Sequence, residues 1–359
     1  MAGILLPAAI AAGLPPLGGA LCIGVAGLGT ALSSDYVIRV GPGISSKAAG
    51  VPLMAVADKG LVLSLIVGSV AFILCYLSIR KDIQAPSAAH LDLWEKADPS
   101  ALGPHPLAQP KSPLLAKRLA LSPRMEKWSR LIAIVTPVAF LAIIIDMILP
   151  TFWPGFEAPQ GGAAAAIVGG VAGLLMLAVC LISDGRGAFR SVAGHFTDGL
   201  VFAFRAMAQV LPIAGFFFIG VASLAGPILS VEAGHKVPGF LFELVRAADH
   251  LIPRNRYFVT FGVMFSGMIT GIDGSGFAGL PLTGALAGAL GRAVNLDVAT
   301  LAAVGQMGSV WTGKTLTAWS AFAAVAAFAR VSIFECVRKV FFPVLCGLIV
   351  ATIAAIIIW

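Results

Sequence analysis

An aspartate stands in the middle of an apolar segment that is long enough to cross a membrane. The segment covers residues 257–290, and Asp273 lies about sixteen residues into it, within the run Gly271-Ile272-Asp273-Gly274-Ser275-Gly276. At a rise of about 1.5 Å per residue, this depth corresponds to the midplane of a bilayer. A carboxylate is costly there, and interrupted backbone is tolerated only where protein or a water-filled cavity satisfies its polar groups. The run therefore predicts a site for an ion or a polar ligand.

A second apolar segment, residues 298–328, carries a lysine at the same depth. Lys314 would either hold the carboxylate of a ligand or pair with Asp273, and a small shift of the span would instead let it reach an interface. Nearby hydroxyl groups would serve a carboxylate or a cation. The candidate residues of these two segments are Thr270, Asp273, Gly274, Ser275, Gly276, Ser309, Thr312, Lys314 and Thr315.

The N-terminal part of the chain contains a similar interruption. Small polar residues and an acid, Ser34 and Asp35, break an apolar segment there, and Gly41-Pro42 follows them as Gly279-Leu280-Pro281 follows the Asp273 run. Paired broken segments in two halves of a chain are a pointer to a transporter site. Ser34 and Asp35 therefore join the candidate set, although the similarity covers only about a dozen residues and chance is the alternative.

Glycine spacing in these segments has simpler explanations. The pairs Gly267/Gly271 and Gly284/Gly288 have the spacing that permits close helix packing. Residues 308–315 match the P-loop pattern and residues 274–279 match G-x-G-x-x-G. Neither match follows a strand in a βαβ unit, so we expect no nucleotide cofactor. We expect no other cofactor either, and leave open only Na⁺ as a coupling ion.

Composition predicts an all-α polytopic membrane protein. The chain is 58% hydrophobic and 11% charged, whereas soluble domains carry about 25% charged residues. We expect eight to ten embedded segments, some of them broken, and an inverted repeat. The five cysteines show no ligand spacing, which predicts no metal site. The net charge of +7 indicates cations retained on the cytoplasmic side of a bacterial inner membrane, not a nucleic-acid partner.

Charge placement predicts the order of the segments. Residues 1–79 hold the N-terminal membrane segments, 80–130 form a basic cytoplasmic linker, and 131–359 form a C-terminal transmembrane half. Within that half we expect a re-entrant hairpin at 197–228, an interfacial amphipathic helix at 238–252, an outward crossing through the Asp273 segment and a return through 298–328. If the fold consists of two inverted repeats, most leading spans of the first are missing, and Met1 would be an internal start.

This pattern resembles the ion transporter superfamily of bacterial secondary carriers, which includes gluconate, citrate and C4-dicarboxylate permeases. The matching features are the hairpin expected at 197–228, the Asp273 run and residues 308–315, so the resemblance covers 131–359 in outline. It implies inverted repeats, re-entrant hairpins and broken helices around an anion site at the midplane. The short N-terminal part departs from that pattern.

We therefore expect an ion-coupled transporter of a small organic anion, with Lys314 and helix N-termini favouring the anion and Asp273 favouring the coupling cation, H⁺ or Na⁺. The alternatives are a non-transporting membrane subunit or truncated permease, a channel and, least favoured, a membrane-embedded enzyme. The five histidines are scattered without metal spacing, so we expect no enzymatic activity. The expected partners are the lipid bilayer and the anion; the oligomeric state is left open, with a homodimer among the alternatives.

Overall fold

The computed structural model describes residues 2–96, 123–152, 162–207 and 255–359, together with a few residues between 219 and 240. All regular elements in these residues are helices, which confirms the expected all-α fold class. Five helical segments among them are long and apolar enough to cross a membrane. The protein is therefore an all-α polytopic membrane protein.

Two compact units make up the chain, and they differ from the predicted division. The first combines Met1–Tyr36, Gly41–Gln109 and Gln209–Trp359, and the second combines Val37–Val40 with Pro110–Ala208. The predicted C-terminal half, residues 131–359, is thus divided between them. The N-terminal helices pack with the C-terminal ones because each set buries its apolar face against the other, so the change in composition after residue 79 is not a boundary between the two units.

Two long helices, α5 (Leu53–Ile79) and α17 (Ile333–Ile358), form the centre of the first unit. They are antiparallel, because Lys59 Nζ lies 5.8 Å from the centroid of the Trp359 ring. At their crossing, a Cβ on Gly347 would lie 2.8 Å from the carbonyl oxygen of Val67, so only glycine allows this approach. The end at which α5 begins is called the Lys59 end, and the end at which it finishes is called the Ile79 end.

A first discontinuous helix precedes α5. Its parts are α2 (Pro16–Cys22), the π-helix η1 (Ile23–Ala31), the short α3 (Leu32–Ser34) and α4 (Val40–Ala49). Gly18 packs against Ile79, and farther along the helix Ser33 Oγ lies 2.7 Å from Ser64 Oγ. Asp35 adopts a left-handed conformation (φ 39°), which ends α3. The chain therefore runs from the Ile79 end to the Lys59 end with an interruption halfway.

A second discontinuous helix precedes α17 and runs the other way. Its parts are α15 (Val298–Trp311), the π-helix η6 (Thr312–Leu316) and, after an interruption that begins at Thr317, α16 (Phe322–Ala329). At the Lys59 end, Asp297 at the start of α15 forms an ion pair with Lys59. At the Ile79 end, Trp94 of α6 (Ala88–Lys96) donates a hydrogen bond of 2.9 Å to the carbonyl oxygen of Ala329.

Residues 16–79 and 298–358 therefore form an inverted repeat, in which a discontinuous helix and then a long helix occur in opposite directions. In both copies a π-helix precedes the interruption, and π-helical turns are frequent at functional sites. The similarity between two runs of this sequence paired the interruption at Asp35 with the one at Asp273. That pairing is wrong in structural terms, because the counterpart of the interruption at Asp35 is the interruption at Thr317.

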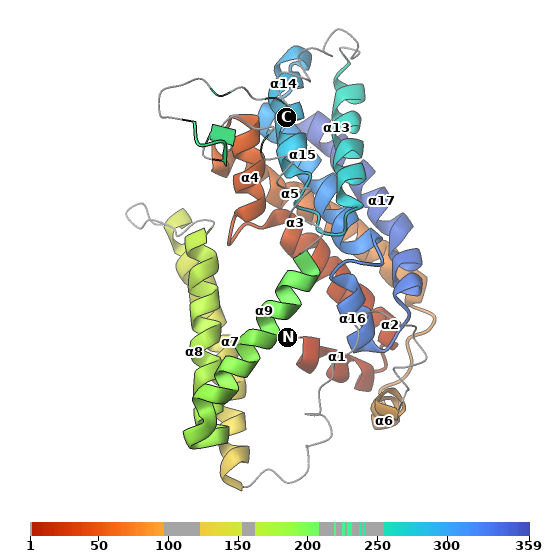
Figure 1. Ribbon diagram of the computed structural model, residues 1–359. Helices are drawn as coiled ribbons and strands as arrows, with labels where there is room; N and C mark the ends of the chain where they lie inside the picture. Colours follow the sequence, from red (N-terminus) through yellow and green to blue (C-terminus); the bar gives the residue numbers. More distant parts are fainter. Residues whose placement is uncertain are drawn as a thin grey trace. The chain divides into compact units, whose positions relative to one another are not determined.

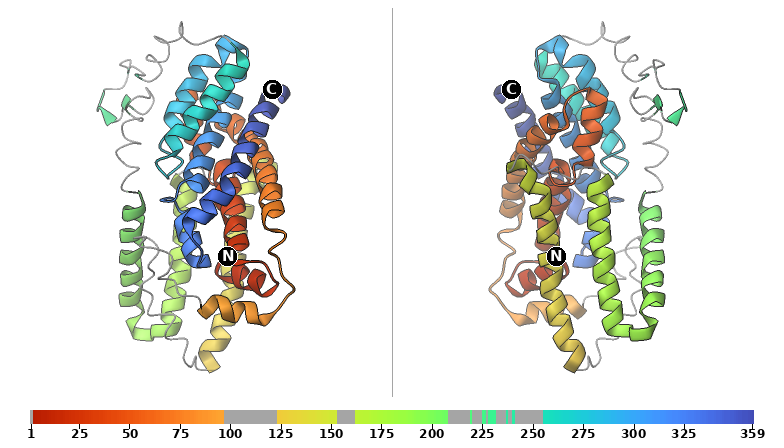
Figure 2. Two further views of the ribbon diagram at one scale, coloured as in Figure 1. Left: turned by 90° about the vertical axis from the view of Figure 1, so that its right-hand side faces the viewer. Right: turned by 90° about the vertical axis from the view of Figure 1, so that its left-hand side faces the viewer.

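The segment that contains Asp273 is a hairpin. Its arms are α13 (Arg256–Gly271) and α14 (Leu280–Leu290). Arg256 Nη2 donates to the carbonyl oxygen of Ile356, and Gly288 packs against the backbone of Ala49. The first arm therefore begins, and the second arm finishes, at the Lys59 end of the unit. The outer ends of both arms also lie toward the C-terminus in all views (Figures 1 and 2). The expected outward crossing is thus replaced by a re-entrant hairpin.

The turn of this hairpin, residues 272–279, is called the tip. Gly274 and Gly276 have positive φ angles of 87° and 70°, which let the chain reverse within a few residues. The hairpin expected at 197–228 lies mostly outside the described residues, and so does the amphipathic helix expected at 238–252. The described start of the former belongs to a continuous helix, α9 (Ala188–Met207).

The described residues of the second unit form three long helices. They are α7 (Pro123–Phe152), α8 (Gly162–Asp184) and α9, with the short 3₁₀ turn η3 (Gly185–Gly187) between the last two. Met147 and Ala164 are buried where α7 meets α8, and Phe196 packs against Gly173 between α9 and α8. Large apolar side chains cover the outer faces of these helices, as a lipid environment requires.

Part of the predicted linker 80–130 is folded. Helix α6 packs near α1 (Ala2–Ala11), and the Arg330 guanidinium stacks on the Trp94 ring with its carbon 5.1 Å from the centroid. Arg330 also donates to the carbonyl oxygen of Trp94 at 2.9 Å. The first seventeen residues of that segment therefore belong to the Ile79 end of the first unit (80–96).

Candidate functional site

Asp273 organises the tip with its own carboxylate. Oδ1 accepts the backbone N–H groups of Ser275 at 3.0 Å and Gly276 at 3.3 Å, and Oδ2 accepts the hydroxyl group of Ser275. Ser275 Oγ in turn accepts the N–H groups of Phe277 and Ala278. These bonds satisfy backbone donors that the missing helical turn leaves free. The carboxylate predicted as a ligand site is therefore also the structural centre of the turn.

The tip is fixed to α15 by very close packing. Ser309, which is fully buried, donates from its hydroxyl group to the carbonyl oxygen of Gly276 at 3.0 Å. A Cβ on Gly276 would lie 2.9 Å from Val310 Cα, and Gly313 lies against the backbone of Gly276 from the other side. Any movement of the tip must therefore also change its contacts with the start of η6.

Trp319 covers the other side of the tip. Its indole Nε1 donates to the carbonyl oxygen of Ile272 at 2.9 Å, and its ring lies so close to Gly274 that a Cβ there would be 2.7 Å from Trp319 Cδ1. Trp319 belongs to the interruption between η6 and α16. The tip and the second interruption are thus joined directly, a contact that the sequence did not indicate.

Phe277 of the tip contacts both discontinuous helices. Lys314 Nζ lies 5.4 Å from the centroid of the Phe277 ring, a cation–π distance. A Cβ on Gly41, at the start of α4, would lie 3.2 Å from Phe277 Cε1. The tip therefore lies between the two discontinuous helices. No ion pair joins Lys314 to Asp273 or to any other carboxylate among the described residues, so the predicted pairing is limited to a longer-range attraction between the charges of Lys314 and Asp273.

The first interruption holds a buried acid. Asp35 is 8% exposed, and its Oδ2 accepts the N–H of Gly41 at 2.7 Å, which caps the N-terminus of α4. Ser34 donates to the carbonyl oxygen of Ala31 within its own helix turn. Asp35 is thus brought close to the tip through Gly41 and Phe277, whereas the Ser34 hydroxyl is engaged locally.

Gln306 is the main polar residue that the sequence analysis missed. It is fully buried; its Oε1 accepts the hydroxyl group of Ser45 at 3.0 Å and its Nε2 donates to the carbonyl oxygen of Ser33 at 2.8 Å. The amide joins α15 to both sides of the first interruption. Its position in the middle of the apolar segment 298–328 is a signal that could have identified it, because an amide inside a span needs buried partners.

Two predicted hydroxyl groups have structural roles. Thr270 Oγ1 donates to the carbonyl oxygens of Ser266 and Gly267, both at 3.0 Å, and Thr315 Oγ1 donates to that of Trp311 at 2.6 Å. These residues satisfy their hydroxyl groups within their own helices. Because both hydroxyl groups already donate to an acceptor, neither of them requires a ligand to be satisfied.

Three buried side-chain groups among the described residues lack hydrogen-bond partners: Arg256 Nε, Trp311 Nε1 and Thr312 Oγ1. The last two are close together in the chain, where Trp311 is fully buried and Thr312 is 5% exposed. Both stand where α15 passes into η6. Unsatisfied buried groups are rare in folded proteins and mark positions that need a specific explanation.

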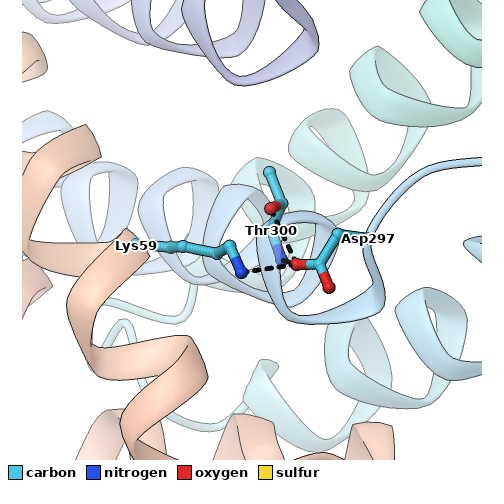
Figure 3. A network of polar contacts seen from close by, with 3 residues as sticks. All are labelled: Lys59, Asp297 and Thr300. Carbon is cyan, nitrogen blue, oxygen red and sulfur yellow. Dashed lines mark hydrogen bonds and ion pairs between the residues drawn. The ribbon is translucent and has the colours of Figure 1, made fainter. Parts of the chain in front are cut away.

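An ion pair holds the start of α15 at the Lys59 end (Figure 3). Asp297 Oδ2 lies 2.7 Å from Lys59 Nζ and accepts the backbone N–H and the hydroxyl group of Thr300 at 2.8 and 2.9 Å. Partial burial opposes ionisation of Asp297, but the hydrogen bonds from Lys59 and Thr300 outweigh it and hold the pKa of Asp297 below its usual value. Asp297 therefore joins α15 to α5 while capping α15.

Known proteins place the chain in a family. Over 355 residues it is 33% identical to the uncharacterized membrane protein YhfA of Bacillus subtilis, and the match covers 98% of this chain and 71% of YhfA. The chain belongs to the YhfA family. Because the match covers 98% of the chain, the tip and both interruptions, which are internal, lie within the region shared with YhfA. No protein-family model matches the chain. No solved structure matches it either.

Proposed function

We propose that this YhfA-family protein is an ion-coupled secondary transporter of a small organic anion. The observation that carries the proposal is the position of the tip between two discontinuous helices that run in opposite directions. Interrupted helices at membrane depth leave backbone polar groups available to ligands, and inverted pairs of them are typical of carriers that alternate their access.

The charges beside the tip support an anion and a coupling cation. Lys314 forms no ion pair among the described residues and has only a longer-range attraction to Asp273, so its ammonium group can still contact a substrate carboxylate. Asp273 accepts three hydrogen bonds, whereas an ionised carboxylate has about four acceptor positions. A proton or Na⁺ at the remaining position would change the bonds that shape the tip. Cation binding and the conformation of the hairpin would then be linked.

A thermal unfolding screen of the detergent-purified protein tests this proposal. The ligands are the gluconate, citrate and succinate salts of N-methylglucamine, each added with and without NaCl. We expect one carboxylate to raise the unfolding temperature, because a ligand that binds only the folded state stabilises it. A larger shift in Na⁺ would identify Na⁺ as the coupling ion, and a shift unaffected by Na⁺ would favour H⁺. A folded protein that responds to none of the three would contradict the proposal and favour a non-transporting subunit.

A further inference from the structure

The hydroxyl group of Thr312 differs from those of the other threonines in these helices. The threonines at positions 260, 270, 315, 317 and 352 each donate to the carbonyl oxygen four residues earlier. The carbonyl oxygen of Gly308 accepts the backbone N–H of Thr312, and the buried Thr312 hydroxyl makes no hydrogen bond among the described residues. A buried hydroxyl without a partner costs about 1–3 kcal/mol, so a ligand atom or water that accepts its hydrogen bond would be stabilised at this position.

The indole N–H of the neighbouring residue, Trp311, also lacks a hydrogen-bond acceptor among the described residues. The six-membered ring of Trp311 lies against Gly29 of η1, and its atoms Cε3, Cζ3 and Cη2 are the nearest to that glycine. The opposite edge of the indole carries Nε1, which finds no acceptor. Three residues after Trp311, Lys314 lies over the face of Phe277 and forms no ion pair among the described residues, although Asp273 attracts it at longer range. One turn of the chain thus offers three donors without a hydrogen-bond acceptor in the part of the chain that the structure describes.

The chemistry of these donors selects the kind of ligand. An indole N–H and an ammonium group can only donate hydrogen bonds, and a hydroxyl group can donate as well as accept. A bound metal cation needs oxygen acceptors and would be repelled by Lys314. The set therefore suits a ligand rich in acceptor atoms and negative charge, which a carboxylate provides. Hydrogen bonds to a charged acceptor are also stronger than those to a neutral one.

We infer that the turn formed by Trp311, Thr312 and Lys314 is the seat of a substrate carboxylate, separate from the cation position at Asp273. This inference rests on the proposed transport function and assigns its anion subsite to the junction of α15 and η6. The π-helical turn is part of the reason, because it widens the helix where the donors occur. The tip packs on the same junction through Ser309 and Gly313, so an anion seated there would contact the element that moves.

A pair of isosteric variants tests the subsite. Thr312→Val removes a hydroxyl that bonds to nothing in the protein, and Thr315→Val removes one that bonds to the carbonyl oxygen of Trp311. Each is measured in the thermal unfolding screen with the same three carboxylate salts. We expect the ligand-free Thr312→Val protein to unfold at or above the wild-type temperature but to bind the carboxylate about 10- to 100-fold more weakly. The Thr315→Val protein should unfold earlier without ligand and keep wild-type affinity.

Further variants separate the possible outcomes. Trp311→Phe and Lys314→Gln should each weaken binding, and Thr312→Val combined with Lys314→Gln should be non-additive because both contact one ligand. A wild-type protein that binds a carboxylate with affinity unchanged in Thr312→Val and Lys314→Gln would overturn the subsite, leave the transport proposal standing and assign the unpaired groups to buried water. A wild-type protein that binds none of the three carboxylates would overturn both.

Discussion

Asp273 illustrates how one residue can serve a fold and a ligand site together. Its carboxylate accepts three hydrogen bonds from the two residues that follow Gly274, and these bonds replace the missing helical turn. The sequence predicts that the same carboxylate lies at membrane depth, where it would serve an ion. The structural role explains why the tip keeps its shape, and the remaining acceptor capacity is what the transport proposal uses.

Two substitutions at Asp273 separate these roles. Asp273→Asn keeps an amide oxygen that can accept the N–H groups of Ser275 and Gly276, so we expect a folded protein that has lost ion-driven uptake. Asp273→Ala removes all three hydrogen bonds and should lower the free energy of unfolding by about 1–3 kcal/mol. The measurements are uptake in proteoliposomes and thermal unfolding in detergent. Wild-type uptake by the Asp273→Asn protein would refute a coupling role for this residue.

The contact between α13 and α15 depends on glycine at the scale of whole elements. Gly267 and Gly271 of α13 lie against the backbone of residues 305 and 309, and Gly308 of α15 lies against the backbone of Met264. The close packing predicted from the spacing of Gly267 and Gly271 is therefore present. Gly284 of α14 packs in the same way against the carbonyl oxygen of Ser45 in α4.

A matched pair of alanine substitutions tests this contact. A Cβ at Gly308 would meet the backbone of Met264 and Met268, which cannot move aside as a side chain can, so Gly308→Ala should destabilise the protein by about 1–3 kcal/mol. Gly262→Ala is the control on α13, because nothing lies within 4 Å of its Cβ position. The control should be neutral or stabilising by up to about 1 kcal/mol through higher helix propensity. Equal thermal stability of the two variants would contradict the assigned packing.

The cap of α15 predicts a dependence of stability on pH. The folded-state pKa of Asp297 is lowered, so its contribution is fully present above the unfolded-state pKa of about 3.9 and is lost as the pH falls through the folded-state value. Wild-type protein should therefore lose stability below about pH 4 more steeply than Asp297→Asn, which cannot ionise. Thermal unfolding measured from neutral to acidic pH checks this. Parallel profiles for the two proteins would show that the ion pair with Lys59 contributes nothing.

At the scale of the molecule, the sequence predicted the helical fold class better than the direction in which each segment runs. Asp273 lies in the tip and Lys314 lies beside it, as expected of two residues that form one site, whereas their depth in a membrane stays a prediction. The reversal at Gly274 and Gly276 could not be predicted, because glycine permits a positive φ without requiring it. Gln306 was missed because an uncharged amide interrupts an apolar pattern only slightly, although it makes two buried hydrogen bonds, to Ser45 and Ser33.

The re-entrant hairpin makes a prediction about membrane sides. In a background without the native cysteines, single cysteines at Tyr257 and Arg292, near the outer ends of the two arms, should react with a membrane-impermeant maleimide from the same side. A cysteine at Leu93, which is 69% exposed at the Ile79 end, should react from the opposite side. Labelling of positions 257 and 292 from opposite sides would restore the crossing that the sequence first indicated.

Gradient-driven uptake tests the central claim most directly. The protein is reconstituted into vesicles, and accumulation of the carboxylate that gives the largest thermal shift is followed under an inward Na⁺ or H⁺ gradient. We predict accumulation above that of protein-free vesicles, collapse of it when the gradient is dissipated, and none with Asp273→Asn. Folded wild-type protein that accumulates no carboxylate under either gradient would contradict the account.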